Sequence, residues 1–175
     1  ECGLDYTVHA VDLTAGNQFE PAFLAISPNG KVPAIVDHEG PGGHAVNLFE
    51  SGAILLYLAD KTGRFLPSEP TRRWQVVQWL MLQMAGVGPT FGQAGYFLHR
   101  AAEPQPAAVE HFVGEEERLM GVIDGRLAGA EFFAGEYTIA DMAYFPWLRN
   151  HRRFQIDLAD FPATARWLDV VARRP

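Results

Sequence analysis

The hydrophobic pattern of the first third of the chain changes about every ten residues. Residues 6–11 alternate, with Tyr6, Val8 and Ala10 on one side, which predicts a strand. The elements expected after it are a short helix over 21–26, a strand over 31–37, a Gly/Pro turn over 40–43, a second strand over 46–49 that completes a hairpin, and an apolar helix over 52–61 ending at Gly63. The predicted order is strand, helix, strand, strand, helix.

The strand pattern disappears after a stretch that prolines bracket, Leu66 to Pro70. We therefore predict a domain over 1–67, a linker over 68–73 and an all-helical domain over 74–175. This domain is predicted to begin with an almost wholly apolar helix over 74–84, which bends or breaks at Gly86, Gly88 and Pro89 and is followed by a loop-like region over 91–99. A long amphipathic helix is expected over 107–127. A capping box from Thr138 to Asp141 opens the next helix, and Pro162 occupies the first position of the last one.

The chain opens on the sequence Glu-Cys-Gly-Leu, which is typical of the end of a helix with Gly3 at the C′ position. A strand and a helix are therefore expected to precede this sequence. Such an upstream strand would pair with the elements that follow, because a sheet without a central strand exposes its backbone edges.

Composition and charge narrow the class of protein. With 14 basic and 21 acidic residues, the net charge is −7, and adjacent basic residues form only isolated pairs (72/73, 152/153 and 173/174), which argues against nucleic-acid binding. No apolar run approaches the length of about 20 residues that a membrane span requires. The single cysteine, Cys2, excludes an internal disulfide and is expected to be a small buried side chain. The six histidines show no metal-ligand spacing, so we predict no metal site.

The Val32-Pro33 pair enters the predicted strand directly after a Gly-Lys turn. A cis peptide bond here would leave the backbone groups of Val32 at the sheet edge, where they could pair with a peptide lying antiparallel to the strand. A trans proline that only protects an edge strand is the alternative, and the local sequence leaves both interpretations open.

Glu50-Ser51 precedes the apolar helix over 52–61. Ser51 is suited to be the N-cap, so that the first backbone N–H groups could bind a carboxylate, while Glu50 could hold an ammonium group. Those two groups together form the head of an α-amino acid. An ordinary helix cap beside a solvated acid is the alternative interpretation.

The two motifs occur in SPNGKVPAIVD and LFESGAILLYLADKTG, on consecutive elements, and both stretches closely resemble the glutathione-binding half of glutathione transferases. The sequence YTIADMAYFPW resembles the capping box in the helical half of that family, and QWLMLQMAGVGPTFGQ resembles its bacterial nu-class branch, whose members are often glutathione-dependent disulfide-bond reductases. The resemblance implies an α/β plus all-α protein: a thioredoxin-like N-terminal domain, lacking its first strand and most of its first helix here, followed by an all-helical C-terminal domain.

The resemblance also implies a set of glutathione-binding residues. The backbone of Val32, before a cis Pro33, would pair with the cysteinyl part of glutathione, and Glu50 and Ser51 would hold its γ-glutamyl end. Lys31 would lie near the glycyl carboxylate, and Gln18 matches a glutamine of a nu-class loop. Arg118 matches an arginine that reaches glutathione from the partner subunit, although a surface arginine beside Glu115 to Glu117 remains the alternative.

The implied activity uses the glutathione thiolate, as co-substrate, to attack a disulfide or a small electrophile. The residue that donates to this sulfur lies just after the first strand in the family, and it is therefore expected upstream of Glu1. The resemblance implies a homodimer, and the lone cysteine fits a reducing compartment, so a cytoplasmic protein is expected. The alternative is a non-catalytic docking module that keeps the fold; a glutaredoxin-like enzyme fits less well, because no CxxC motif is present.

Overall fold

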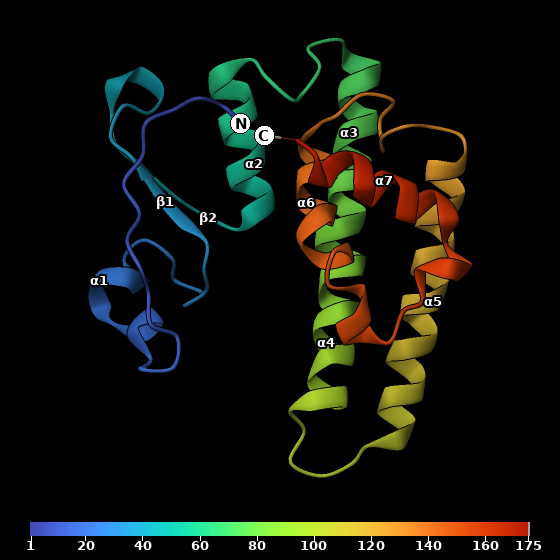
Figure 1. Ribbon diagram of the computed structural model, residues 1–175. Helices are drawn as coiled ribbons and strands as arrows, with labels where there is room; N and C mark the ends of the chain where they lie inside the picture. Colours follow the sequence, from blue (N-terminus) through green and yellow to red (C-terminus); the bar gives the residue numbers. More distant parts are fainter. Residues whose placement is uncertain (175) are drawn as a thin grey trace. The chain divides into compact units, whose positions relative to one another are not determined.

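The computed structural model describes residues 1–174, and the chain divides into two compact units, Glu1–Arg64 and Phe65–Pro175. Each unit has its own packing and is described separately (Figure 1). The helix α3 begins at Pro70, inside the predicted linker over 68–73. In the described residues no helix combines the length and the apolar character needed to cross a bilayer.

The N-terminal unit is a β-hairpin packed against one helix. Its elements are η1 (Asn17–Phe19), α1 (Pro21–Leu24), β1 (Ala34–Asp37), η2 (Pro41–Gly43), β2 (Val46–Phe49) and α2 (Ser51–Thr62). The strands are antiparallel, with Ala34 opposite Phe49 and Asp37 opposite Val46. The predicted hairpin and the end of α2 at Gly63, which is left-handed with φ 65°, are confirmed.

The predicted strand over 6–11 is wrong for the described chain. These residues form no helix or strand, and the side chains of Tyr6 and Val8 are 84% and 76% exposed. Alternating hydrophobic and polar residues are compatible with a strand, but a strand also requires a neighbouring strand with which its backbone forms hydrogen bonds. Among residues 1–174 the sheet contains β1 and β2 alone, so this segment has no strand partner there.

The C-terminal unit is a helical bundle. Its elements are α3 (Pro70–Leu82), η3 (Gln83–Val87), α4 (Gly88–His99), α5 (Pro106–Ala128), α6 (Ile139–Leu148), η4 (His151–Phe154), η5 (Leu158–Asp160) and α7 (Pro162–Ala172). Glu69 caps α3 by accepting hydrogen bonds from the amides of Thr71 and Arg72, both at 2.8 Å. Helix α4 lies along α5, and α7 also packs on α5.

The glycine-rich region after α3 differs from the prediction. Gly86, Gly88 and Pro89 do not break the helix; instead η3 is a π-helical segment that joins α3 to α4. Residues 91–99, expected to be loop-like, belong to α4 and include the fully buried Phe91. A proline removes one backbone hydrogen bond from a continuous helix. The π-helical segment, in which the amide of Gly88 donates to the carbonyl of Gln83, lies directly before Pro89.

The capping box predicted at Thr138 is present and does more than start α6. The buried carboxylate of Asp141 accepts hydrogen bonds from the amide of Thr138 (3.0 Å), the hydroxyl of Thr138 (3.2 Å), the amide of Phe133 (3.2 Å) and the indole N–H of Trp167 (2.9 Å). These donors come from α7, from the start of α6 and from the loop before it. The carboxylate therefore ties the start of α6 and the loop before it to α7, which is distant in sequence.

The buried stripe of α5 contains one acid, Glu116. Its neighbours in the stripe are Leu119, Met120, Ile123 and Leu127, and Glu116 itself is 0% exposed. Neither of its carboxyl oxygens has a hydrogen-bond partner among the described residues. Burial raises the pKa of Glu116 to about 8. At neutral pH the folded protein therefore keeps this side chain protonated.

We predict that the stability of the helical unit falls as the pH rises from about 4.5 to about 8. In this window the unfolded state releases the proton of Glu116 while the folded state retains it, which lowers the free energy of unfolding by up to roughly 1 kcal/mol per pH unit. Glu116→Gln is neutral and similar in size, so it should weaken this dependence and be more stable than the wild type at pH 8. Urea unfolding at several pH values measures both effects. The control is Glu117→Gln, an exposed neighbour, and equal pH profiles for the wild type and Glu116→Gln would contradict the prediction.

Candidate functional site

The turn that leads into β1 presents the Val32-Pro33 motif. The peptide bond between Val32 and Pro33 is cis, as the resemblance implied, and the side chain of Val32 is 44% exposed. The fully buried Ser27 fixes the preceding turn, because its hydroxyl donates to the carbonyl of Lys31 at 2.9 Å. The exposed backbone at Val32 is therefore held by a buried hydrogen bond directly before it in the chain.

Gly30 brings this turn against the segment that contains Gln18. Gly30 is buried with φ 62°, and a Cβ atom there would lie 3.0 Å from the ring of Phe19 and 3.4 Å from the carbonyl oxygen of Gln18. A side chain at position 30 would therefore be strained in both backbone and packing. The side-chain oxygen of Gln18 is buried and has no hydrogen-bond partner among the described residues. Gln18 and Lys31 consequently lie in neighbouring segments of the same unit.

Glu50 occupies a strained junction between β2 and α2. Its φ of 69° and ψ of 115° are unusual for a residue other than glycine, and its carbonyl accepts the first hydrogen bond of α2, from the amide of Ile54 at 3.0 Å. Strain of this kind is retained where the surrounding structure imposes it, and it is frequent at binding sites.

The structure corrects the assignment of the helix cap. Ser51 was expected to be the N-cap, but the cap position belongs to Glu50 and Ser51 is the first residue of α2. The chain turns at Glu50, because that residue has the positive φ, and Ser51 already has a helical position. The amides of Gly52 and Ala53 have no acceptor within the helix, so the start of α2 can still bind a negatively charged group.

The register of the hairpin brings the two motifs together. Because Ala34 pairs with Phe49, the residues before β1, Val32 and Pro33, and the residues after β2, Glu50 and Ser51, lie at the same end of the hairpin. An exposed peptide backbone and a helix N-terminus with an adjacent acid are therefore neighbours. Together they can recognise a short peptide that carries an α-amino-acid head group.

Arg118 lies in the other unit, on α5. It is exposed and forms a two-pronged ion pair with Glu115, with Nε and Nη2 each 2.6 Å from a carboxylate oxygen. This pairing raises the pKa of Arg118 and lowers the pKa of Glu115. Within this chain, the guanidinium group is held by its own helix.

Sequence reasoning missed the polar network that fixes the hairpin on α2. The carboxylate of Asp37 accepts hydrogen bonds from the hydroxyl of Tyr57 (2.6 Å), from the ammonium of Lys61 and from the amide of Glu39 (3.0 Å), and Lys61 also donates to the carbonyl of Glu39 (3.0 Å). The four-residue spacing of Tyr57 and Lys61 places both on one helix face and was the available signal. This network ties the far end of β1 to α2, while the candidate site lies at the near end.

Cys2 and a possible metal site were also considered in the sequence analysis. Cys2 is half-buried rather than fully buried, and its sulfur accepts a hydrogen bond from the hydroxyl of Thr62 at 3.7 Å. No cluster of histidine, cysteine and acidic side chains suited to a metal ion occurs in residues 1–174.

Comparisons with known proteins cover both units. Residues 1–61 match the family model described as glutathione S-transferase, N-terminal domain, and residues 87–175 match glutathione S-transferase, C-terminal domain. The chain is 48% identical to the disulfide-bond oxidoreductase YfcG of Escherichia coli, a match that covers 100% of this chain and 82% of the relative. It is 37% identical to the disulfide-bond oxidoreductase YghU of Escherichia coli, over 99% of this chain and 62% of the relative.

A solved structure is similar over nearly the whole chain. It is a glutathione transferase from Pseudomonas putida with one glutathione disulfide bound per subunit; the TM-score is 0.95 at 43% identity, covering 99% of this chain and 79% of that one.

We predict that the Asp37 network survives strong acid. The pKa of Asp37 is lowered to about 2, with the largest effect from the hydrogen bond of Lys61 and the next from that of Tyr57. A lowered pKa stabilises the fold at pH values above the ordinary aspartate range, and this contribution is lost as the pH falls through about 2. A carboxyl carbon NMR titration should place the Asp37 midpoint near 2, and Lys61→Met should raise it toward the ordinary value. A midpoint near 4 in both proteins would show that the network does not form.

Proposed function

Because this chain belongs to the glutathione transferase family, we propose that it binds glutathione in its N-terminal unit and uses the glutathione thiolate to reduce disulfides. The expected family and fold class are thereby confirmed. The observation that carries the choice of reaction is the 48% identity to a disulfide-bond oxidoreductase along the whole chain. Conjugation of small electrophiles is the second candidate, favoured by the likeness to a glutathione transferase.

The proposed binding mode uses the geometry at the near end of the hairpin. The backbone of Val32, before the cis Pro33, pairs with the cysteinyl part of glutathione by strand addition. The carboxylate of Glu50 holds the γ-glutamyl ammonium group, and Ser51 with the start of α2 holds the γ-glutamyl carboxylate. Lys31 lies near the glycyl carboxylate, Gln18 also contacts glutathione, and Arg118 serves the site of the partner subunit.

The proposed reaction proceeds by thiol–disulfide exchange. The thiolate of one glutathione attacks a substrate sulfur, and the other substrate sulfur leaves as a thiolate that takes up a proton. A second glutathione thiolate then attacks the glutathione sulfur of the mixed disulfide, which releases the second substrate thiol and glutathione disulfide. The protein favours the thiolate by donating hydrogen bonds to it, and no residue of 1–175 is assigned that task. This chemistry requires a pool of reduced glutathione, which supports the cytoplasm as its location.

We predict that Glu50→Ala weakens glutathione binding by about tenfold or more, because it removes a charge-assisted hydrogen bond, and that Ser51→Ala weakens it a few-fold. Isothermal titration calorimetry of the full-length protein with reduced and oxidised glutathione measures both. Glu39→Ala, an exposed acid outside the site, and Val32→Ala, which keeps the backbone groups, are the controls and should bind as the wild type does.

Turnover of 2-hydroxyethyl disulfide, coupled to glutathione reductase, tests the reaction itself. Binding with turnover supports the reductase; binding without turnover of this disulfide or of a chlorodinitrobenzene electrophile would favour the docking module. Unchanged affinity in Glu50→Ala and Ser51→Ala would contradict the proposed site.

We also propose that the protein is a homodimer through one face of α3. Trp74 and Met81 lie two helical turns apart on that helix and are 68% and 43% exposed, which is unusual for large apolar side chains that have no partner. Trp79 and Met84, in the same region, are half-buried, and the ring centroids of Trp79 and Phe133 are 5.5 Å apart.

Trp74→Glu should convert the dimer to a monomer, because it places a charge in an apolar interface. Light scattering at micromolar concentration measures the mass. Val122→Glu, at an exposed apolar position on α5, is the matched control and should remain dimeric. A monomeric wild-type protein would refute the proposal.

A further inference from the structure

A single carboxylate, that of Asp12, holds together the loop that contains Gln18. Its Oδ1 atom accepts hydrogen bonds from the hydroxyl of Thr14 (2.7 Å), from the amide of Thr14 (2.9 Å) and from the amide of Ala15 (3.1 Å). These bonds lower the pKa of Asp12, and the bond from the Thr14 hydroxyl has the largest effect. The carboxylate is therefore the charged acceptor on which the fold of this loop rests.

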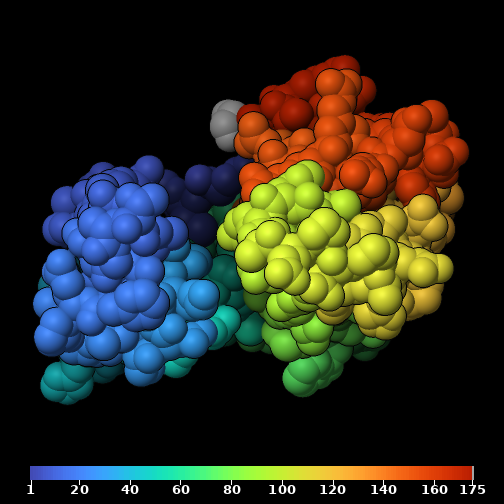
Figure 2. All heavy atoms as spheres, turned by 90° about the horizontal axis from the view of Figure 1, so that it is seen from below, coloured from blue at the N-terminus to red at the C-terminus, as the bar shows by residue number. Residues whose placement is uncertain are grey.

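The loop has little other support. Residues near the start of the chain, coloured blue, form much of the visible surface of the N-terminal unit (Figure 2), and η1 contains no buried residue. A segment without buried apolar contacts depends on its local hydrogen bonds for a defined conformation.

Two backbone hydrogen bonds flank Gln18. The amide of Asn17 donates to the carbonyl of Asp12 at 3.0 Å, and the amide of Phe19 donates to the carbonyl of Gly16 at 2.9 Å. Gly16 has φ 81°, a left-handed conformation that glycine adopts without the steric cost of a side chain. The chain is therefore fixed directly before and directly after Gln18.

Gln18 has a polar atom that the chain leaves without a partner. Its Oε1 atom is buried, and no donor among the described residues contacts it. A buried amide oxygen requires a donor, so this atom is available to an N–H group of a bound peptide. The carbonyl of Gln18 and the ring of Phe19 also lie against Gly30, the residue before Lys31. The loop consequently borders the proposed glutathione site.

We propose that Asp12 is a positioning residue for glutathione binding, which holds the loop so that the side chain of Gln18 meets the bound tripeptide. This inference rests on the proposed glutathione site and adds a residue that acts through Gln18 rather than by its own contact with the ligand. Without the carboxylate, the hydroxyl and amide of Thr14 and the amide of Ala15 lose their acceptor. Glutathione would then have to order the loop as it binds, which lowers its affinity.

The test is a double-mutant cycle on Asp12 and Gln18, measured by isothermal titration calorimetry of the full-length protein with reduced glutathione. Gln18→Ala should weaken binding about tenfold and Asp12→Ala about fivefold, because a positioning residue contributes less than the contact that it positions. In the Gln18→Ala background, Asp12→Ala should have no further effect. Asp12→Asn keeps a side-chain oxygen that can accept the same hydrogen bonds, so its affinity should stay within about twofold of the wild type.

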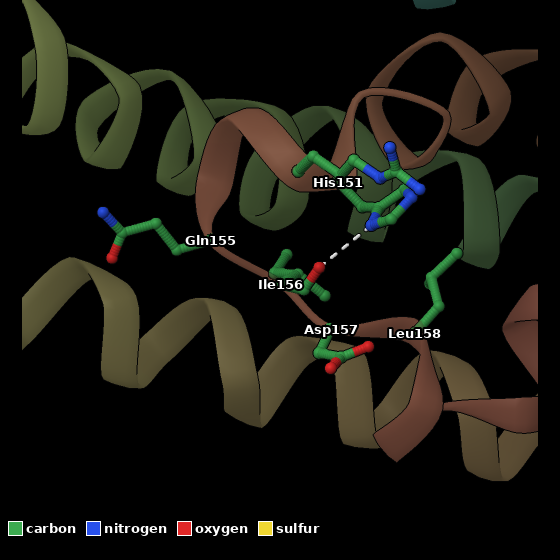
Figure 3. Close-up of a pocket in the computed structure, with 6 residues that line it drawn as sticks. His151, Gln155, Ile156, Asp157 and Leu158 are labelled. Carbon is green, nitrogen blue, oxygen red and sulfur yellow. Dashed lines mark hydrogen bonds between the residues drawn. The ribbon is translucent and has the colours of Figure 1, made fainter.

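Two other aspartates are matched controls. Asp5 is an exposed acid of the same unit, so Asp5→Ala removes the same charge outside the loop. Asp157 lines a cavity of the helical unit (Figure 3), and its Oδ1 accepts from the amide of Ala159 at 2.9 Å, which resembles the contact of Asp12 with Ala15. Asp5→Ala and Asp157→Ala should both bind glutathione as tightly as the wild type. Melting temperatures check that each variant is folded.

The cycle separates positioning from a general effect on the fold. An equal loss from Asp12→Ala in the wild type and in Gln18→Ala would show that Asp12 acts independently of Gln18 and would overturn the inference. Full affinity in Gln18→Ala, or binding by Asp12→Asn that is as weak as that of Asp12→Ala, would overturn it as well. The proposed glutathione site would survive each of these results, because it depends on the losses in Glu50→Ala and Ser51→Ala.

Discussion

The helical unit depends on the carboxylate of Asp141. Its two oxygens accept from two amides, a hydroxyl and an indole N–H, and these donors belong to the loop before α6, to the first residue before that helix and to α7. Burial raises the pKa of this carboxyl, while the four hydrogen bonds lower it. A buried charged group is tolerated only when its hydrogen-bonding capacity is satisfied, so the surrounding helices must hold one arrangement. Glu116 differs from Asp141 in that it is buried without any hydrogen-bond partner among the described residues, and its pKa is raised to about 8.

The N-terminal unit presents backbone groups at one end of its hairpin. The buried hydroxyl of Ser27 fixes the turn before Val32, and Gly30 allows that turn to lie close to Phe19. At the opposite end, Asp37 ties β1 to Tyr57 and Lys61 of α2. The unusual backbone of Glu50 then directs the chain from β2 into α2. The candidate site is therefore built from ordinary local interactions whose positions are set by the pairing of two short strands.

Sequence patterns predicted this protein well where the signal was local. The strand over 46–49, the long helix α5, the helix end at Gly63 and the capping box at Thr138 all rest on residues that act within one or two turns of the chain. The failures involve partners at a distance. The alternation over 6–11 gives no strand because no neighbour pairs with it among the described residues, and the glycines near residue 88 allow a π-helical continuation that packing stabilises. Ser51 was displaced from the cap because Glu50 takes the positive φ.

By itself, the sequence determined the family, the two-part organisation of elements and the identity of the candidate binding residues, since these follow from local motifs and their order. Tertiary structure alone decided which of those residues are neighbours: the register of Ala34 with Phe49 brings Val32 and Glu50 to one end of the hairpin. It also decided the protonation of Glu116 and the network of Asp37. The physical reason is that desolvation and charge proximity depend on distances through space, which separation along the chain does not specify.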